Sequence, residues 1–559
     1  MLNKFTFISE DKRVRRDILP QKIICCGGEV VGQASLLEKK DFLTITNVSV
    51  PNTVLKNGDK GENAFFVLDF GCEFHGSIRI ISVRLKGKSK YARVRITFGE
   101  SLTEALSDLG EKGATNDHSP RDFVCNIVQL SDLEYGMGGF RFVKVELLSP
   151  DCELQLHSIT GVFIYSDLEY KGSFKCSDET LNRIYDVAAY TAHLNIQRYV
   201  WDGIKRDRLV WGGDINPELK AIRTIFGRCD ELEKTINYFG KSTPAGSWVN
   251  GIPTYTLWWL ISVYEWYFCT GNKEFLKSQR NCVIETVKQI LLFIDDDGSI
   301  NRFPGQFLDH ATNELEETVH SIRGLFCEAL KAASELCSLY KEKEISDECL
   351  EKIPLIQKRE GDSNKIKAIA AFMYNAGIPD KYDVGQTLTN DGAKGLSTFM
   401  SYYIFKAMSE SGHHKEAIAI LKDYYGAMLN LGATTFWEDF NIEWAKNAVR
   451  IDEMPDNSRK NIHSDFGGYC YKGLRHSLCH GWSAGPVPFL NDYVLGIKIL
   501  EPGCKSVEIK GDLGDLDWAE GTFPTPFGTI YVRHQKQDDG SLKTVINAPE
   551  QILIKCENN

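Results

Sequence analysis

The spacing of hydrophobic residues changes twice along the chain, and this change most limits the folds that the chain can adopt. Between about residues 20 and 165, short alternating or apolar runs are broken by Gly, Asn and Asp, as in β-strands. From about 177 to 490, apolar residues recur at i, i+3 and i+4 in segments of helical length. Strand-like runs return after 490. The sequence therefore predicts a multidomain α+β protein with domains at 1–168, 169–490 and 491–559.

The two strand-rich regions predict different units. The first predicts a β-sandwich, with expected strands at 22–26, 42–50, 64–70, 77–85, 91–98, 122–130, 140–148 and 153–164. The last region predicts a small C-terminal β-domain. Within it, residues 522–528, Thr-Phe-Pro-Thr-Pro-Phe-Gly, are expected to form a rigid turn.

The middle region contains about ten to twelve predicted helices, separated by glycines and short polar turns, as antiparallel helix pairs require. They include the segments 178–194, 255–269, 274–294, 321–340, 397–411 and 414–429. That number suits six helical hairpins arranged as an (α/α)6 barrel. In such a toroid the loops that join outer to inner helices surround one mouth, so functional residues are expected in the helix-connecting segments.

Charge, hydropathy and cysteine usage narrow the class of protein. The 559 residues carry a formal net charge of −11 without a basic block, so we expect no nucleic-acid partner. No long apolar window and no signal-peptide pattern occurs, so we expect no membrane partner. Apart from Cys25-Cys26, the 16 cysteines are scattered. We therefore expect reduced thiols and, if Met1 is the natural start, a cytoplasmic location.

No cofactor and no metal are expected. The chain lacks a Gly-rich phosphate loop, a cysteine cluster and a calcium-loop pattern. His476 and His480 form a His-x-x-x-His pair, but the adjacent glutamate of a zinc-protease helix and a third ligand are missing. The sequence carries no indication of oligomeric state.

The stretch 202–214, Asp-Gly-Ile-Lys-Arg-Asp-Arg-Leu-Val-Trp-Gly-Gly-Asp, is the most informative for function. It combines three carboxylates, three cations and a tryptophan around a double glycine. Carboxylates accept hydrogen bonds from vicinal hydroxyls, an aromatic ring stacks on sugar C–H bonds, and a cation tunes pKa values. The stretch therefore predicts a carbohydrate site, with Asp202, Arg206, Trp211 and Asp214 as sugar-binding residues.

Three other helix-connecting segments carry similar clusters. Residues 301–310 place Asp309 behind a Pro-Gly break, residues 432–440 set Glu438 beside Trp437, and residues 477–485 surround His480 with small residues and Trp482. Splitting a glycosidic bond requires one carboxyl that protonates the leaving oxygen and a second that activates water or attacks the anomeric carbon. The remaining groups are expected to hold the sugar: Asp309, Trp437, His480, Trp482 and, as a further aromatic residue, Trp248.

These motifs resemble those of the α-L-rhamnosidase family, glycoside hydrolase family 78. Residues 202–214 are similar to its Asp-Cys-Pro-x-Arg-Glu-Arg-x-x-Trp-x-Gly-Asp signature. Gly432-Ala-Thr-Thr-Phe-Trp-Glu438 resembles its Gly-Ala-Thr-Thr-hydrophobic-Trp-Glu segment, and Ser477-Leu-Cys-His480 its Ser-hydrophobic-Asn-His element. Residues 521–528 are similar to its Gly-x-x-Pro-Thr-x-x-Gly stretch. Order and approximate separation agree from the first domain to the last.

The resemblance implies an inverting hydrolase of terminal α-L-rhamnosides, or of related deoxysugars, with a catalytic (α/α)6 barrel between β-domains. By position it makes Asp207 the general acid and Glu438 the general base. Asp202 and Asp214 would hold sugar hydroxyls, with Arg206 and His480 also in the sugar pocket. Inversion predicts a separation of roughly 6.5–9.5 Å between the two catalytic carboxyls.

Two positions depart from the family pattern. The family commonly has Glu at the position of Asp207, and an aspartate reaches about 1.5 Å less far, a difference to which catalysis is sensitive. The Cys-Pro pair of the family is replaced by Gly203-Ile204, which loosens the backbone entering the motif.

Each residue also has a structural interpretation. Asp214 could cap the next helix, and Asp202 and Arg206 could form an exposed i,i+4 ion pair. Asp207 could instead pair with Arg206 or Arg208 in a structural role, and Glu438 could be a first-turn glutamate. The tryptophans could belong to the core. Two other functions also stay open: a carbohydrate-binding protein that has lost catalysis, and another toroid enzyme such as a polysaccharide lyase or an unsaturated-uronide hydrolase.

Overall fold

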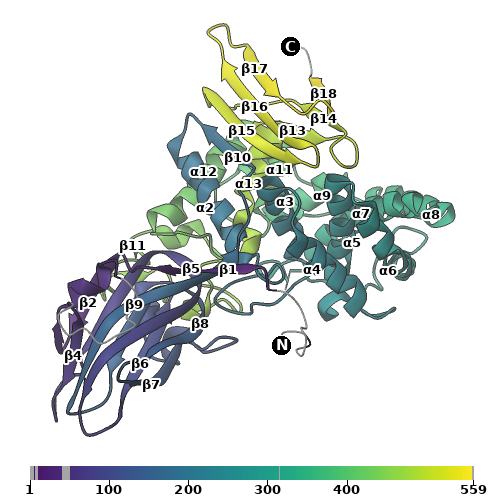
Figure 1. Cartoon of the computed structure of the whole chain (residues 1–559). Helices are drawn as coiled ribbons and strands as arrows, with labels where there is room; N and C mark the ends of the chain where they lie inside the picture. Colours follow the sequence, from purple (N-terminus) through teal and green to yellow (C-terminus); the bar gives the residue numbers. More distant parts are fainter. Residues whose placement is uncertain (1–5, 7–10, 41–50, 314, 557–559) are drawn as a thin grey trace.

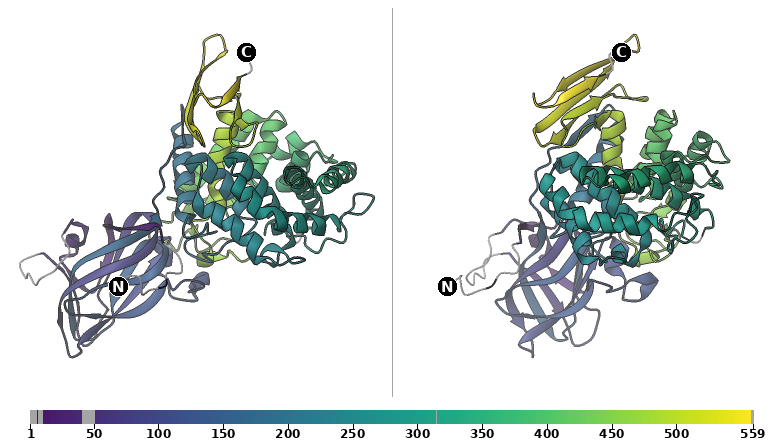
Figure 2. Two further views of the ribbon diagram at one scale, coloured as in Figure 1. Left: turned by 45° about the vertical axis from the view of Figure 1, so that its right-hand side comes forward. Right: turned by 90° about the vertical axis from the view of Figure 1, so that its right-hand side faces the viewer.

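The computed structural model describes residues 6, 11–40, 51–313 and 315–556. It has an N-terminal sheet-rich domain, a helical middle and C-terminal sheets, in the predicted order (Figure 1). Figure 2 shows the two sheet-rich regions on different sides of the helical domain. The expected strand at 42–50 lies outside the described residues.

The N-terminal domain is built on one nine-stranded antiparallel sheet whose main path runs β3-β4-β9-β5-β8-β6-β7. Its strands are β1 (Arg13–Ile18), β2 (Lys22–Gly27), β3 (Glu29–Val31), β4 (Thr53–Asn57), β5 (Phe65–Lys86), β6 (Tyr91–Gly99), β7 (Asp122–Val128), β8 (Asp132–Leu147) and β9 (Cys152–Ser166). The strands expected at 64–70 and 77–85 are one continuous strand, β5. Irregularities in its pairing with β8, between Asp69 and Phe74 and between Gly76 and Ile78, let it cross the sheet without a break.

The middle of the chain contains twelve helices from α2 to α13 within the described residues, which agrees with the predicted number. They are α2 (Glu179–Asn195), α3 (Ile215–Phe226), α4 (Asp230–Ser242), α5 (Pro253–Thr270), α6 (Lys273–Leu291), α7 (Thr318–Leu339), α8 (Lys343–Gln357), α9 (Lys367–Ala376), α10 (Val384–Thr389), α11 (Ser401–Glu410), α12 (His414–Asn430) and α13 (Pro486–Phe489). Alternate helices are neighbours: α3 contacts α5, and the contacts continue through α7, α9, α11 and α13 back to α3.

The C-terminal strands form two sheets, with strand orders β10-β15-β16-β17 and β13-β14-β18. The strands are β13 (Ile497–Ile499), β14 (Ser506–Ile509), β15 (Trp518–Thr525), β16 (Gly528–Lys536), β17 (Leu542–Asn547) and β18 (Leu553–Cys556). The partner of β15, β10 (Ser173–Cys176), precedes the helices in the sequence. One hydrophobic core runs through the helices and these sheets, and a second fills the N-terminal domain.

The turn predicted at 522–528 is wrong in extent. Residues 522–525 belong to β15 and only two residues separate it from β16. Pro524 is tolerated in this central strand because the pairing with β10 ends at Thr522, so the missing N–H of Pro524 leaves no ladder bond unmade there.

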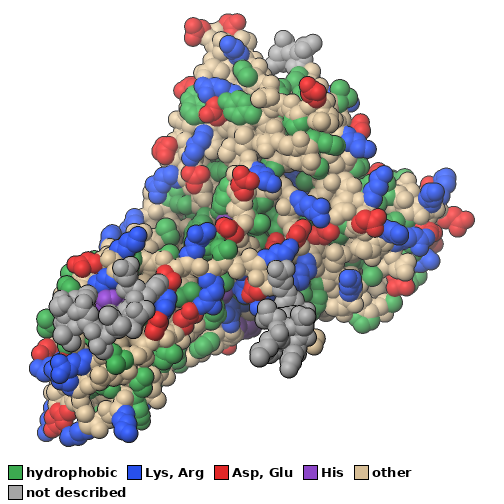
Figure 3. All heavy atoms as spheres, viewed as in Figure 1, with side chains coloured by type: hydrophobic (Ala, Val, Ile, Leu, Met, Phe, Trp, Pro, Cys, Tyr) green, Lys and Arg blue, Asp and Glu red, His purple; other side chains and the backbone are tan. Residues whose placement is uncertain are grey.

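Two surface properties complete the description. On the face drawn in Figure 3, basic and acidic side chains are interspersed, without a large area of one sign. Among the described residues, none of the helices combines the length and the apolar character needed to cross a bilayer.

Candidate active site

Three of the four predicted segments meet at one place. Gly203 pairs with His480 in an antiparallel bridge, and the amide of Gly481 donates to the carbonyl of Asp202 at 2.8 Å. The amide of Glu438 donates to the carbonyl of Ser477 at 3.0 Å, and the amide of His480 to that of Phe436 at 3.1 Å. Backbone hydrogen bonds thus align the loops after α2, after α12 and before α13.

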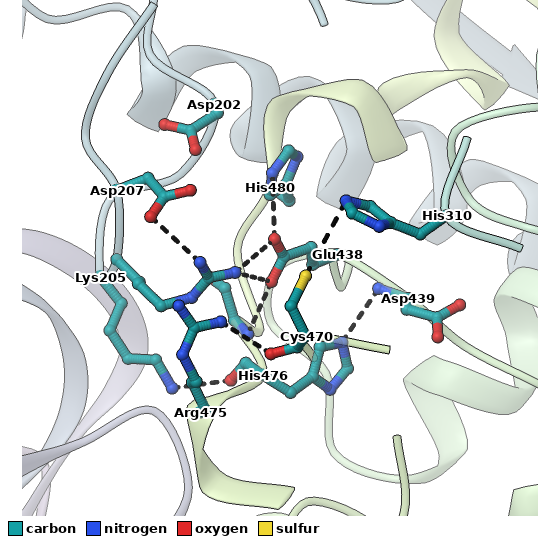
Figure 4. Close-up of polar contacts among 12 residues, drawn as sticks. Asp202, Lys205, Asp207, His310, Glu438, Asp439, Cys470, Arg475, His476 and His480 are labelled. Atoms are coloured by element: carbon teal, nitrogen blue, oxygen red, sulfur yellow. Dashed lines mark hydrogen bonds and ion pairs between the residues drawn. The ribbon is translucent and has the colours of Figure 1, made fainter. Parts of the chain in front are cut away.

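Arg206 joins the two predicted catalytic carboxylates (Figure 4). Its Nη2 donates to both oxygens of Glu438, at 2.6 and 2.9 Å, and its Nη1 donates to Oδ1 of Asp207 at 3.0 Å. Arg206 and Glu438 are buried. Burial alone would lower the pKa of Arg206, but Glu438 and Asp207 raise it above the ordinary value. Arg206 is therefore a permanent cation between two carboxylates.

The exposed ion pair and the helix cap considered for this motif do not occur. Arg206 bonds Asp207 and Glu438, while Asp202 accepts the amide of Leu209 at 3.1 Å. Asp214 precedes α3 but makes no capping hydrogen bond with its side chain, and its Oδ2 is buried without a partner. Asp202 is thus a buried carboxyl with a backbone donor, whereas Asp214 keeps a buried oxygen without a partner, a costly condition for a purely structural residue.

Burial favours the neutral form of both of these carboxyls. It raises the pKa of Asp202 well above the usual range, and Asp214 and Asp207 add to the increase. Burial likewise raises the pKa of Asp214, although a hydrogen bond with Tyr255 opposes it. A neutral carboxyl can both donate and accept hydrogen bonds, so each can pair with either end of a sugar hydroxyl group.

His480 lies beside the pair as a neutral imidazole. Its Nε2 is 3.6 Å from Oε1 of Glu438 and 3.9 Å from Oδ1 of Asp214. Burial, followed by the charge of Arg206, holds its pKa well below the ordinary value. The His476 ring instead accepts the amide of Asp439 at 2.9 Å. The two histidines of the His-x-x-x-His pair therefore have different partners.

Glu438 lines a small hollow that Asp309 and Trp482 also border. Trp482 donates from Nε1 to the carbonyl of Glu438 at 2.9 Å and stacks on Phe399 with ring centroids 4.7 Å apart. Asp309 accepts from Thr312 and Ser397, while burial raises its pKa. Asp309 and Trp482 therefore border the same hollow as Glu438.

The other three tryptophans differ from one another. Trp211 is half-buried and meets Tyr255, the hydrogen-bond partner of Asp214, edge-on at 6.3 Å. Trp437 is fully buried and packs against Phe440, so its ring belongs to the core. Trp248 packs against Phe293 and Phe303 in a separate aromatic cluster. For Trp437 and Trp248 the structural interpretation holds, because large rings stabilise most by burial.

Several site residues were missed from the sequence. Glu218, in α3, has both carboxylate oxygens buried without a partner, and burial followed by Asp214 and Asp202 raises its pKa well above normal. In the sequence, its position one helical turn after Asp214 could have indicated that Glu218 belongs to the site. Asp439 and His310 directly follow predicted residues, and both line the hollow. Tyr471, whose ring lies 5.7 Å from the Arg206 guanidinium, stands in a loop without a recognisable pattern.

Within the described residues, one group has the spacing of metal ligands: Glu100, Glu104 and His463. The ammonium of Lys205 lies 2.9 Å from Glu100 and 3.2 Å from Glu104. A cation from the chain itself therefore already neutralises these buried carboxylates.

Comparison with known proteins finds similarity to rhamnosidases. Residues 169–346 match the model of the bacterial α-L-rhamnosidase six-hairpin glycosidase domain. An α-L-rhamnosidase of Formosa agariphila is 23% identical over 166 residues, which cover 28% of this chain and 17% of that protein.

Solved structures agree in fold at low sequence identity. A family 78 rhamnosidase of a Bacillus species aligns with a TM-score of 0.74 at 22% identity, over 94% of this chain and 55% of its own length. The rhamnosidase of Klebsiella oxytoca, solved with rhamnose bound, aligns with a TM-score of 0.66 at 19% identity, over 86% of this chain and 96% of its own. This chain thus spans about half of the Bacillus protein and a smaller part of the Formosa one.

The fold is therefore that of the solved rhamnosidases, with a helical domain between sheet-rich regions. The matched domain and the curated relative agree with the resemblance to the α-L-rhamnosidase family, glycoside hydrolase family 78, that the motifs indicate.

Proposed function

We propose that this protein is an inverting glycoside hydrolase that releases terminal α-L-rhamnose, or a related deoxysugar, from glycosides or oligosaccharides. Asp207 is the general acid and Glu438 the general base. The observation that carries the proposal is the bridge formed by Arg206, which brings Asp207 together with a carboxylate 232 positions away from Arg206 in the sequence.

The bridge also limits the distance between the two carboxylates. One guanidinium and its two hydrogen bonds span at most about 8 Å, which is compatible with the 6.5–9.5 Å of inverting glycosidases. A water molecule can then lie between the base and the anomeric carbon.

The reaction follows from these positions. Protonated Asp207 gives its proton to the glycosidic oxygen as the anomeric C–O bond breaks, and the aglycone leaves as an alcohol. Glu438 takes a proton from water, whose oxygen forms the new bond to the anomeric carbon. Proton exchange with solvent then restores both carboxyls. Neutral Asp202 and Asp214 hold hydroxyls, and neutral His480 orients Glu438 without competing for its charge.

The residues that line the hollow support the proposal that the substrate is a deoxysugar. Phe399, Tyr471 and Trp482 give the hollow an aromatic wall, against which a methyl group in place of a hydroxymethyl leaves no hydrogen bond unmade.

The architecture proposed with this function is an (α/α)6 barrel at 169–490, between an N-terminal β-sandwich at 1–168 and a C-terminal β-domain at 491–559. The cycle of contacts from α3 through α13 supports an inner ring of six helices.

Substitution of the two carboxyls tests the proposal. We expect Glu438→Gln to lower kcat on p-nitrophenyl α-L-rhamnoside by 10²-fold or more, and Asp207→Asn to do the same on unactivated rhamnosides. Asp186→Asn, an exposed carboxylate on α2, is the matched control and should be unaffected. Proton NMR during hydrolysis should detect the β-anomer of the sugar first.

Each contrary result has a distinct meaning. Full activity in either variant contradicts the role of that residue, and the α-anomer as first product contradicts inversion. If the wild type hydrolyses no glycoside of a panel but binds L-rhamnose in calorimetry, the protein is a carbohydrate-binding relative.

A further inference from the structure

The loop before β7, residues 114–121 of the N-terminal domain, lies against the 202–214 motif. Nε2 of His118 is 3.3 Å from Oδ1 of Asp207. The carbonyl of the same histidine accepts a hydrogen bond from Nη2 of Arg208 at 2.6 Å, and Met137 O accepts one from Nη1 of Arg208 at 3.4 Å. One residue of the sheet-rich domain thus contacts both Asp207 and its neighbour.

This contact is part of a continuous interface beneath the motif. A Cβ atom added to Gly139 would lie 2.6 Å from the Ile204 side chain and 2.8 Å from its carbonyl carbon, so only glycine permits this approach. Lys205 inserts between Glu100 and Glu104 of the N-terminal domain. The motif therefore cannot shift relative to His118 without breaking buried contacts on both sides.

The backbone at the contact is held in an unusual conformation. His118, Asp207 and Arg208 all have a positive φ, at 62°, 57° and 55°. Each such residue costs roughly 1 kcal/mol and persists only where surrounding contacts hold it, which occurs most often at functional sites.

The two contacts of Asp207 fall on one oxygen. Arg206 and His118 both contact Oδ1, and within the described residues no hydrogen bond reaches Oδ2. Figure 4 shows the second oxygen of Asp207 pointing away from the contact with Arg206. The carboxyl is thereby held by one oxygen while the other stays available to carry a proton.

We propose that His118 is a positioning residue for Asp207, supplied by the N-terminal domain, so that the active site is completed by two domains. This inference rests on the proposed role of Asp207 as general acid. His118 acts through the acid and not on the sugar, so its removal should affect only the step in which the leaving group is protonated.

Leaving-group dependence gives the decisive test. A 2,4-dinitrophenyl rhamnoside departs without protonation, whereas a methyl rhamnoside requires the acid. We expect His118→Gly, which retains the left-handed backbone without strain, to lower kcat on the methyl rhamnoside about 10- to 100-fold. Turnover of the dinitrophenyl rhamnoside and KM for both substrates should change less than twofold.

Controls separate this role from a structural one. Asp117→Asn alters the preceding residue, which pairs with Arg475 at 3.0 Å, and should leave the ratio of the two rates unchanged. His118→Asn also tolerates the left-handed backbone, and its amide is too short to reach Asp207, so it should behave as His118→Gly and serves if the glycine variant does not fold. An equal loss on both substrates, or no loss, overturns the proposal. An inactive wild type overturns the proposed function itself.

Discussion

At the scale of single residues, the left-handed backbone at Asp207 explains why this position departs from the family pattern. Its φ is 57°, a region in which Asp and Asn are several-fold enriched among non-glycine residues. A glutamate has no such preference. The shorter side chain therefore suits the backbone at this position, and the contacts with Arg206 and His118 hold it at the site.

Asp439 predicts a pH dependence of stability. Burial, followed by Asp309 and Glu438, raises its pKa to about 7. In the unfolded chain it titrates near about 3.9, so between these values the folded protein binds a proton that the unfolded chain has lost. The contribution of Asp439 to stability is therefore greatest below pH 4 and is lost as pH rises through 7.

Removing the carboxyl should remove this dependence. Relative to the wild type, we expect the free energy of unfolding of Asp439→Asn to rise by roughly 2–4 kcal/mol between pH 5 and pH 8. Urea unfolding at several pH values measures it, with exposed Asp186→Asn as the control. A difference that does not vary with pH would contradict the assignment.

At the scale of elements, the site depends on loops that are fastened to one another and not on a helix face. Residues 203, 436–438 and 477–481 exchange backbone hydrogen bonds. Glu100, at the end of β6, accepts from the amide of Leu478 at 2.7 Å and from Ser477 Oγ at 3.2 Å. Ser477 in turn donates its amide to Glu438 at 3.2 Å. The N-terminal domain thus reaches the proposed base as well as the acid.

Lys205 is a buried cation at the contact between these loops and the N-terminal domain. Its ammonium also donates to the carbonyls of Leu474 and His476, at 3.1 and 2.7 Å. We expect Lys205→Met, which keeps the volume, to lower the free energy of unfolding by about 3–5 kcal/mol, because it leaves Glu100 and Glu104 without their counter-ion. Lys241→Met, at an exposed position of α4, should lower the free energy of unfolding by less than about 0.5 kcal/mol. Equal effects in urea unfolding would contradict the role of Lys205.

At the scale of the whole molecule, the C-terminal sheet is continuous with the helical domain. β10 precedes the first long helix yet pairs with β15, so the ends of the helical region are tied together. Phe523, Ile530 and Val532 share one core with the helices, whereas the N-terminal sheet has its own. We infer that the helices and the C-terminal sheet unfold as one unit.

Substitution of two phenylalanines of the β15–β16 hairpin tests whether the helices and the C-terminal sheet unfold together. Phe523 is 1% exposed and Phe527 is 41% exposed. We expect Phe523→Ala to lower the free energy of unfolding by about 3–5 kcal/mol. It should also lower the temperature at which hydrolytic activity is lost. Phe527→Ala should change neither the free energy of unfolding nor the temperature at which activity is lost. Calorimetry and thermal inactivation measure both, and an unchanged inactivation temperature in Phe523→Ala would contradict a shared unit.

Periodicity was enough to predict the order of the three regions and most helices, because local spacing decides which face of an element is apolar. The residues Asp202, Arg206, Asp214, Glu438 and His480 could also be selected from their local motifs, and their roles toward a sugar stay a prediction. The continuity of β5 and the length of the turn before β16 depended on neighbouring strands, which local spacing does not contain.

Tertiary structure alone decided which of these residues touch. Trp437 and Trp482 were both expected to hold the sugar, but packing encloses the first completely and leaves the second on the lining of the hollow. Glu218 and His118 carry no motif, and only the fold brings one beneath Asp214 and the other to Asp207. The sequence determined the chemical groups through local pattern. Their pairing arose from long-range contacts between domains, where burial fixes the distances between the groups and influences their charges.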